Sequence, residues 1–260
     1  MKTFTINNLQ VTDYGSANPP LIFVHAFPLD SRMWNEQAEY FKDKFRVITY
    51  DVRGLGKSYK DEKDVYTMET YADDLLSIIK ELALENVNVC GLSMGGYIIL
   101  RAVQKEPALF SKIILADTKA DADDNTGLLG RAAMINKLQT QGKDFLLTEF
   151  LPKLISEEGL KNENLSSNLK EIITSQDATG IAKAVTAIAL RLNHLENLLK
   201  ISAPVLIVIG EKDKLTPLEN SQKMDFLITD SRLEIIKNAG HISNMENPQD
   251  FNKAIENFLL

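Results

Sequence analysis

Ser93 is the residue of this 260-residue chain whose surroundings most clearly predict chemistry. It lies in Gly91-Leu92-Ser93-Met94-Gly95, after an apolar run that begins at Val87 and before a helical pattern. A serine on such a strand-to-helix turn is lifted clear of the sheet. Gly91 and Gly95 support this turn because a larger side chain there would collide with a neighbouring strand or helix. The helix that follows points free N–H groups at the same place, so the turn predicts nucleophilic attack with oxyanion stabilisation. The alternative is a glycine-rich turn with an incidental serine.

A serine nucleophile needs a base that takes its proton and an acid that orients the base. The chain has three histidines. His241 follows a strand pattern, and loops after parallel strands share one edge of a sheet, so His241 is predicted to reach Ser93. His194 lies away from any strand end, and we assign it to the surface or to packing. His25 ends the first buried strand, and we assign it to loop support.

Two aspartates compete for the place of the acid. Asp213 follows the strand pattern over 205–209, and Asp117 ends an earlier strand pattern. A triad on an open α/β sheet has the chain order serine, acid, histidine, with the acid after a late strand. We therefore predict Asp213 as the acid, and we expect Asp117 to fix the start of the segment that follows it.

The sequence His25-Ala26-Phe27-Pro28 closes the first buried strand, where an oxyanion-hole loop would lie opposite the serine turn. The predicted donors are the backbone N–H groups of Phe27 and Met94. Pro28 biases Phe27 toward extended backbone angles, which helps to fix where the Phe27 N–H points. This chemistry calls for no cofactor and no metal.

The elements that must position these residues follow from the spacing of apolar side chains. Residues 3–6 and 9–14 alternate apolar and polar, which predicts an N-terminal hairpin. Continuous apolar runs alternate with helical patterns in the rest of the chain, which predicts an α/β fold with a doubly wound, mostly parallel sheet. The runs are 21–24, 45–50, 87–92, 112–117, 203–210 and 232–236, and the helical patterns are 31–41, 67–84, the residues after Ser93 to Glu106, and 248–260.

The alternation stops after Asp117. Residues 119–199 contain no convincing strand, only amphipathic helical segments such as 128–138 and 165–173. We therefore predict a core of residues 1–118 and 200–260, with a helical cap at 119–199 inserted after the sixth strand. The side chains of the cap that we expect to close over the serine include Met134, Phe145 and Phe150.

Composition excludes several other classes of function. A net charge of −7 offers no basic surface to a phosphate backbone, so nucleic acid is not an expected partner. No stretch approaches the ~18 apolar residues of a membrane span, and the N-terminal residues lack an export signal, so we expect a cytoplasmic protein without a membrane partner. The single cysteine, Cys90, is expected to be a buried core residue. Asp51 stands where a Walker loop needs glycine, so the glycine-rich stretch at 51–58 does not predict nucleotide binding.

The motifs taken together resemble the α/β-hydrolase superfamily from end to end. They are His25-Ala26-Phe27-Pro28, Asp51-x-Arg53-Gly54-x-Gly56-x-Ser58, Gly91-x-Ser93-x-Gly95-Gly96, Gly210-x-x-Asp213 and Gly240-His241. The resemblance implies Ser93 as nucleophile, His241 as base, Asp213 as acid and a lid after the sixth strand. Within the superfamily the sequence is most similar to small bacterial esterases, 3-oxoadipate enol-lactonases and cofactor-free perhydrolases.

Two departures bear on the substrate. Ala26 stands where the family usually has glycine, and Arg191-Leu192-Asn193 stands where enol-lactonase-like relatives often carry Arg-x-Asp. The leading hypothesis is a serine hydrolase of small carboxylic esters. The alternatives are an enol-lactonase, a perhydrolase that uses the same triad, or a non-enzymatic receptor for a small ligand.

Overall fold

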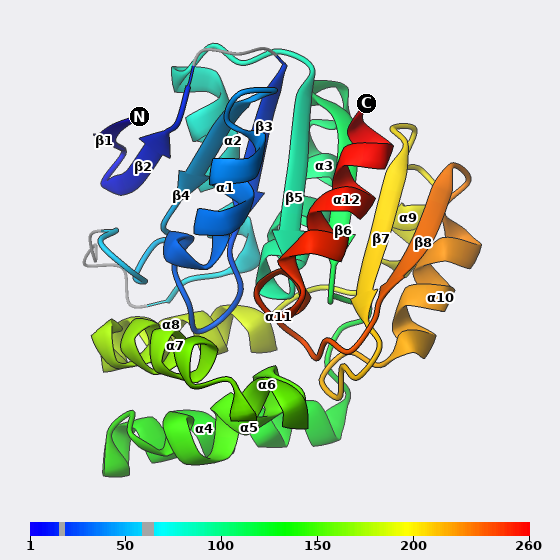
Figure 1. Ribbon diagram of the computed structural model, residues 1–260. Coiled ribbons are helices and arrows are strands. Elements are labelled where there is room, and N and C mark those ends of the chain that lie inside the picture. Colours follow the sequence, from blue (N-terminus) through cyan, green and yellow to red (C-terminus); the bar gives the residue numbers. More distant parts are fainter. Residues whose placement is uncertain (16–18, 59–64) are drawn as a thin grey trace.

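The computed structural model describes residues 1–15, 19–58 and 65–260, and these form an eight-stranded sheet with helices on both faces (Figure 1). The strands are β1 (Lys2–Ile6), β2 (Leu9–Asp13), β3 (Pro20–Val24), β4 (Arg46–Tyr50), β5 (Val87–Leu92), β6 (Phe110–Ala116), β7 (Val205–Gly210) and β8 (Ser231–Ile236). Their order is β1-β2-β4-β3-β5-β6-β7-β8. The pairs β1-β2 and β2-β4 are antiparallel and the others are parallel, which confirms the predicted α/β sheet with an N-terminal hairpin.

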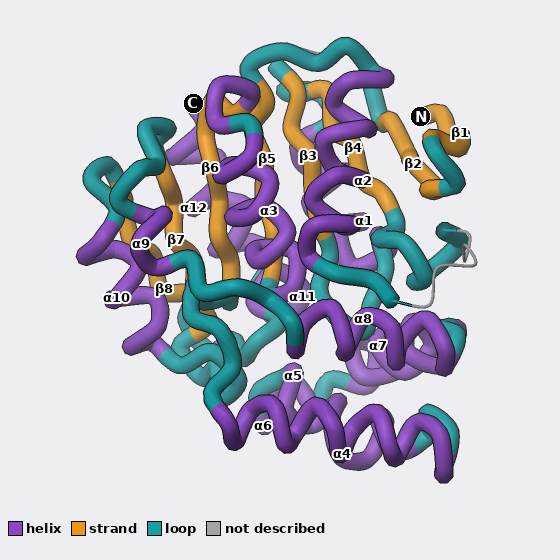
Figure 2. The backbone as a smooth tube through the Cα atoms, turned by 180° about the vertical axis from the view of Figure 1, so that it is seen from behind, coloured by secondary structure: helices purple, strands orange, loops and turns teal. Residues whose placement is uncertain are grey.

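Helices cover the two faces of the sheet. α1 (Asn35–Phe41) and α12 (Pro248–Leu259) pack against each other on one face, and α2 (Met68–Glu81), α3 (Met94–Lys105) and α10 (Leu218–Leu227) lie on the other (Figure 2). The predicted helix over 31–41 is two elements, a 3-10 turn (Ser31–Trp34) followed by α1. Asp30 caps the turn by accepting from the Arg32 N–H, and the Asn35 N–H donates to the Arg32 carbonyl oxygen, three residues back. Short turns η2 (Pro107–Leu109) and α11 (Ser243–Glu246) complete these layers.

Three of the central strands are buried along their whole length, as strands covered on two faces should be. Every residue of β3, β5 and β7 is buried. Aromatic side chains fill the space between the sheet and the α1–α12 layer: the Phe23 and Trp34 rings are 4.8 Å apart, and Trp34 lies 6.1 Å from Phe251. Full burial of one such side chain stabilises the fold by roughly 1.5–3 kcal/mol. The packed core therefore holds the carboxyl ends of these strands in fixed positions.

Residues between β6 and β7 form helices, as the sequence predicts. They are α4 (Asn125–Gln141), a π-helical turn η3 (Leu146–Phe150), α5 (Leu151–Leu154), α6 (Glu157–Lys161), α7 (Glu163–Ser175), α8 (Ala178–Ala189) and α9 (Leu195–Leu198). We call α4 to α8 the helical layer; it lies across the carboxyl ends of the parallel strands (Figure 1). α9 instead packs against α10. Leu138 is the single buried residue of α4, so α4 lies outermost and packs mainly on α8.

Candidate active site

Ser93 joins β5 to α3 in a backbone conformation that non-glycine residues seldom adopt. Its φ is 55° and its ψ is −111°. Such a residue costs about 1–3 kcal/mol and persists only where its surroundings hold it. The Ser93 N–H donates to the Ala116 carbonyl oxygen at 2.9 Å, and the Ser93 carbonyl oxygen accepts from Thr118 Oγ1 at 2.8 Å. The end of β6 therefore holds the turn from both sides.

The glycines beside Ser93 lie where a β-carbon has no room. A Cβ on Gly91 would stand 2.5 Å from the Gly95 carbonyl oxygen, and one on Gly95 would stand 2.1 Å from the Val24 carbonyl oxygen. Both contacts are with backbone atoms, which cannot rotate away. The collision expected at these glycines thus follows from how closely α3 approaches β3 and β5.

His241 and Asp213 are in direct contact. His241 Nδ1 lies 2.8 Å from Asp213 Oδ2, and both residues are buried. Asp213 Oδ2 also accepts from Thr216 Oγ1 at 2.6 Å, and its Oδ1 accepts from the Leu215 and Thr216 N–H groups. Burial opposes the charge of Asp213, but the His241 ring and these hydrogen bonds lower the pKa of the carboxyl below its ordinary value. An ionised carboxylate accepts only, so Nδ1 of the ring carries the proton and Nε2 is left as an acceptor.

The two loops that carry Asp213 and His241 are packed backbone against backbone. A Cβ on Gly210 would stand 2.0 Å from the Gly240 carbonyl oxygen, and the Lys212 N–H donates to the Ala239 carbonyl oxygen at 2.8 Å. Loops held this closely cannot shift separately. The separation of His241 from Asp213 is consequently built into the backbone.

Glu246 ties the His241 loop to the helical layer. Its carboxylate accepts from the Gly240 N–H at 2.6 Å, from the Ser156 N–H at 2.9 Å and from Ser156 Oγ at 2.6 Å. Ser156 is also the N-cap of α6. Movement of α6 is therefore coupled to the loop that holds His241.

We expected Asp117 to fix the start of the helical segment that follows it, but its side chain is hydrogen-bonded elsewhere, and not to His241. Its side chain accepts from the Gly210 N–H at 2.7 Å and from the Ser243 hydroxyl, and it is fully buried. Burial, helped by the nearby charge of Asp213, raises the pKa of Asp117 well above its ordinary value. The start of α4 is fixed by Asp124, which caps the helix by accepting from the Gly127 N–H.

Ser93 and His241 line one cavity of about 80 Å³ beneath the helical layer. The other residues that line it are Phe27, Tyr97, Lys119, Arg131, Phe150, Ile188, Leu215 and Thr216. Phe150 is the only one of the three expected cap side chains in this set, and its ring meets Phe27 edge to face at 5.7 Å. His194 lines a different cavity, beside α3 and α9, in agreement with a packing role.

Sequence reasoning missed several residues of this cavity. Thr216, three residues after Asp213, and Lys119, three residues after the end of β6, could have been found from their places at the same sheet edge. Arg131 lies inside α4 and no sequence signal marks it, because only the packing of α4 brings it to the cavity.

The loop after β3 offers one predicted oxyanion donor and the start of α3 offers the other. Among the described residues we find no acceptor for the N–H groups of Phe27 and Met94. His25 holds this loop to the next one: its Nδ1 donates to the Ala26 carbonyl oxygen at 3.0 Å, and its Nε2 accepts from the Val52 N–H at 2.8 Å. Burial lowers the pKa of His25, so the ring stays neutral and keeps both bonds.

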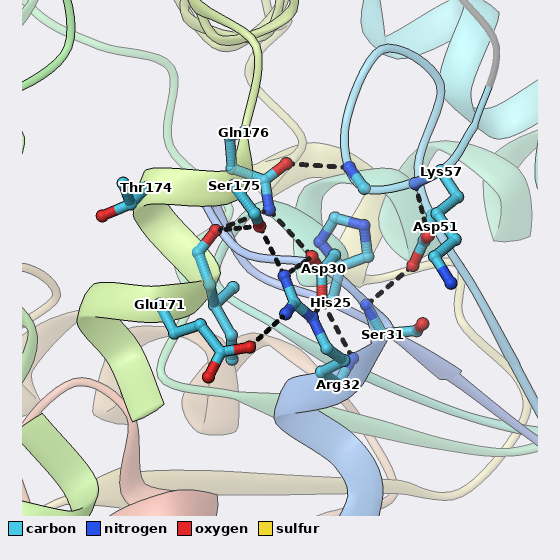
Figure 3. A network of polar contacts seen from close by, with 12 residues as sticks. His25, Asp30, Ser31, Arg32, Asp51, Lys57, Glu171, Thr174, Ser175 and Gln176 are labelled. Atoms are coloured by element: carbon cyan, nitrogen blue, oxygen red, sulfur yellow. Dashed lines mark hydrogen bonds and ion pairs between the residues drawn. The ribbon is translucent and has the colours of Figure 1, made fainter. Parts of the chain in front are cut away.

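A polar network fastens the loops after β3 and β4 to the helical layer (Figure 3). Arg32 forms an ion pair with Asp30 at 2.8 Å and with Glu171 of α7 at 3.1 Å. Gln176, just after α7, donates to Asp30 Oδ2 and accepts from the Gly56 N–H, each at 2.8 Å. Asp51 accepts from the Ser31 and Lys57 N–H groups. The network joins the end of α7 to the loop after β3.

The chain belongs to the family described as "alpha/beta hydrolase fold", whose pattern matches residues 19–248. It is 31% identical over 251 residues to a 3-oxoadipate enol-lactonase of Acinetobacter baylyi. The aligned region covers 95% of this chain and 91% of the relative. These matches confirm the family resemblance seen in the motifs.

Solved structures agree with this membership. A thermophilic esterase from Thermogutta terrifontis, described with malate bound, superposes with a TM-score of 0.93 at 31% identity and covers 100% of this chain and 98% of that one. An esterase from Exiguobacterium antarcticum has a TM-score of 0.88 at 26% identity and covers 96% and 94% of the two chains. In the described part of the chain, no helix has the length and apolar character of a membrane span.

Proposed function

We propose that this protein is a serine hydrolase that cleaves small carboxylic esters through an acyl-enzyme on Ser93. The observation that carries the proposal is that Ser93, on its strained turn, faces the same cavity as His241, whose Nδ1 is held 2.8 Å from Asp213. A serine, a base within the same cavity and an acid that orients the base are the parts that acyl transfer requires. The esterase and enol-lactonase relatives support the same reaction class.

In the proposed first step, Ser93 Oγ attacks the ester carbonyl carbon while His241 Nε2 takes its proton. Asp213 stabilises the imidazolium that forms, and the N–H groups of Phe27 and Met94 hold the oxyanion. His241 then gives its proton to the leaving alcohol. A water molecule, deprotonated by the same Nε2, attacks the acyl-enzyme, so that one ester and one water yield an acid and an alcohol.

The helical layer acts in this proposal as a cap within residues 119–199. It supplies Phe150, Ile188 and Arg131 to the wall of the cavity. A cavity of about 80 Å³ suits a short acyl or alcohol group, well below the ≈300–1,000 Å³ of pockets for drug-sized ligands.

A short-chain p-nitrophenyl ester tests the proposal. We expect Ser93→Ala to lower kcat by at least about 10⁴-fold, because an entire covalent route is lost. A fluorophosphonate probe should label the wild type and leave the variant unlabelled, and circular dichroism checks that both are folded. Activity that survives in folded Ser93→Ala would remove the assignment.

A lactone is the second candidate substrate. It is a cyclic ester that the same residues can open, and the 31% identical relative is named for an enol-lactone. The Thermogutta terrifontis esterase is described with malate, which is a dicarboxylate. Parallel assays of a small lactone and an open-chain ester of equal size would separate the two candidates by their kcat/KM values.

A further inference from the structure

Two cations line the cavity that holds Ser93 and His241, although the chain as a whole is acidic. They are Lys119, between β6 and α4, and Arg131, on the second turn of α4. The net charge of the protein is −7. A neutral ester needs no cation beside the serine, so these side chains call for an explanation of their own.

Both cations share a single carboxylate. Asp123 Oδ2 accepts from Arg131 Nε at 3.0 Å, and Asp123 Oδ1 accepts from Arg191 Nη2 at 2.7 Å and lies 3.5 Å from Lys119 Nζ. Burial opposes the charge of Asp123, yet these guanidinium groups lower the pKa of its carboxyl far below the ordinary value. Three positive charges thus meet one negative charge, which leaves an excess of two.

Arg191 is the structural cation of this cluster, with which Arg131 and Lys119 can be compared. Its side chain is 2% exposed, it donates to the carbonyl oxygens of Asp121 and Ile188, and its guanidinium lies 4.6 Å from the centre of the Tyr97 ring. It joins the two ends of the helical segment between β6 and β7. Its donors all point into the protein, so it is not available to a ligand.

Arg131 and Lys119 differ from Arg191 in exposure and in free donors. Their side chains are 23% and 22% exposed. Arg131 uses Nε for Asp123, and its two terminal nitrogens have no hydrogen-bond partner among the described residues. Lys119 Nζ is too far from Asp123 for a strong hydrogen bond. A guanidinium fixed through Nε presents its outer N–H pair as a fork, the geometry that binds a carboxylate.

We propose that Arg131 and Lys119 form a carboxylate-binding subsite, so that the preferred substrate is an ester or lactone that carries a free carboxylate. This inference rests on the proposed function for the reacting serine but concerns a different part of the cavity. The carboxylate belongs to either the acyl or the alcohol part of the substrate. In both cases its negative charge offsets one of the two excess positive charges of the Asp123 cluster.

Two matched pairs of esters test the subsite. Monomethyl succinate is compared with methyl succinamate, and 4-acetoxybenzoate with 4-acetoxybenzamide, so that each pair differs by a carboxylate against an uncharged amide. The measured quantity is the ratio of kcat/KM values within a pair. One charge-assisted pairing is worth about 10- to 100-fold, so we expect at least one ratio of about 10 or more in the wild type. The pair with the larger ratio identifies the part of the substrate that the subsite binds.

Variants then assign the ratio to residues. Arg131→Gln should bring the ratio to within about threefold of 1, and Arg131→Lys should keep part of it. Lys119→Gln tests the second cation. It also provides the test of the subsite if Arg131→Gln does not fold. Lys137→Met is the matched control: it lies on α4, pairs with Glu149 and does not line the cavity, so its ratio should equal that of the wild type. A ratio within a pair cancels any general loss of activity in a variant. A ratio near 1 for both pairs in the wild type would overturn the inference.

A binding measurement keeps the inference separate from the hydrolysis itself. In Ser93→Ala, glutarate should raise the melting temperature and glutaramide should not, and Arg131→Gln in the same background should abolish the glutarate effect. If neither ester of a pair is hydrolysed but glutarate binds through Arg131, the proposed function fails and the subsite stands. If esters are hydrolysed with ratios near 1 and glutarate has no effect, the subsite fails and the function stands.

Discussion

The carboxyl ends of β6 and β7 each carry a buried aspartate, and the two carboxyl groups meet different partners. Asp213, after β7, contacts the His241 ring, the Thr216 hydroxyl and two backbone N–H groups. Asp117, after β6, accepts from one backbone N–H and from the Ser243 hydroxyl. Among the described residues, none of the groups that shift the pKa of Asp117 is positively charged.

The pKa values of the two groups move in opposite directions for this reason. Burial favours the neutral form of both, but only Asp213 has an imidazole to offset that penalty, so its pKa is lowered and that of Asp117 is raised. The comparison teaches that position at the end of a strand does not by itself make an orienting acid. The aspartate must also contact a base that can become positively charged.

The largest expected effect is the difference between Asp213→Asn and Asp117→Asn. An amide at 213 can hold His241 in the wrong tautomer, with the proton on Nε2, and such a change costs about 10⁴-fold in kcat. An amide at 117 carries no charge, and burial already disfavours the charge of the Asp117 carboxyl, so we expect kcat within about threefold of the wild type. Ester hydrolysis by folded variants measures both, and a greater loss in Asp117→Asn would reverse the assignment of the acid.

The hydroxyl partners of the two carboxyl groups give a smaller contrast. Thr216→Val removes one of the donors to ionised Asp213, and a hydrogen bond to a charged group is worth about 1.5–3 kcal/mol. Because three other donors remain, we expect a loss of about 10-fold in kcat/KM. Ser243→Ala removes the corresponding partner of Asp117 and should cost about 1–2 kcal/mol of unfolding free energy with kcat nearly unchanged. Urea unfolding and ester kinetics on both variants separate these outcomes; equal kinetic losses would contradict the contrast.

The sheet could be predicted from the sequence because its signals are local. Apolar runs such as 205–210 and the glycines beside Ser93 record burial and close backbone approach at each position. Chain order and strand-end position were likewise enough to place His241 and Asp213 at one edge, and the structure brings these two side chains into contact.

The partners of Asp117 and the cationic wall of the cavity could not be predicted in this way. Asp117 meets Ser243, which is 126 residues away, and Arg131 reaches the cavity only through the packing of α4. The amphipathic pattern that we predicted over 128–138 was wrong: α4 has one buried residue, so it has almost no apolar stripe from which its orientation could be predicted. Contacts that depend on how a weakly amphipathic helix is placed leave no trace in local spacing.

The pH dependence of stability tests the two carboxyl groups independently of catalysis. The pKa of Asp117 is higher in the folded protein than the value of about 3.9 in an unfolded chain, so the folded state holds the extra proton and loses stability as pH rises above that value. The pKa of Asp213 is lower when folded, so its contribution is complete above about pH 4 and is lost only below it. Urea unfolding between pH 4.5 and 7.5 should therefore show the unfolding free energy of Asp117→Asn rising relative to that of the wild type, by at most about 1.4 kcal/mol per pH unit. A level difference for Asp117→Asn would mean that Asp117 is ionised in the folded protein, and the contrast between the two strand ends would then lie in geometry alone.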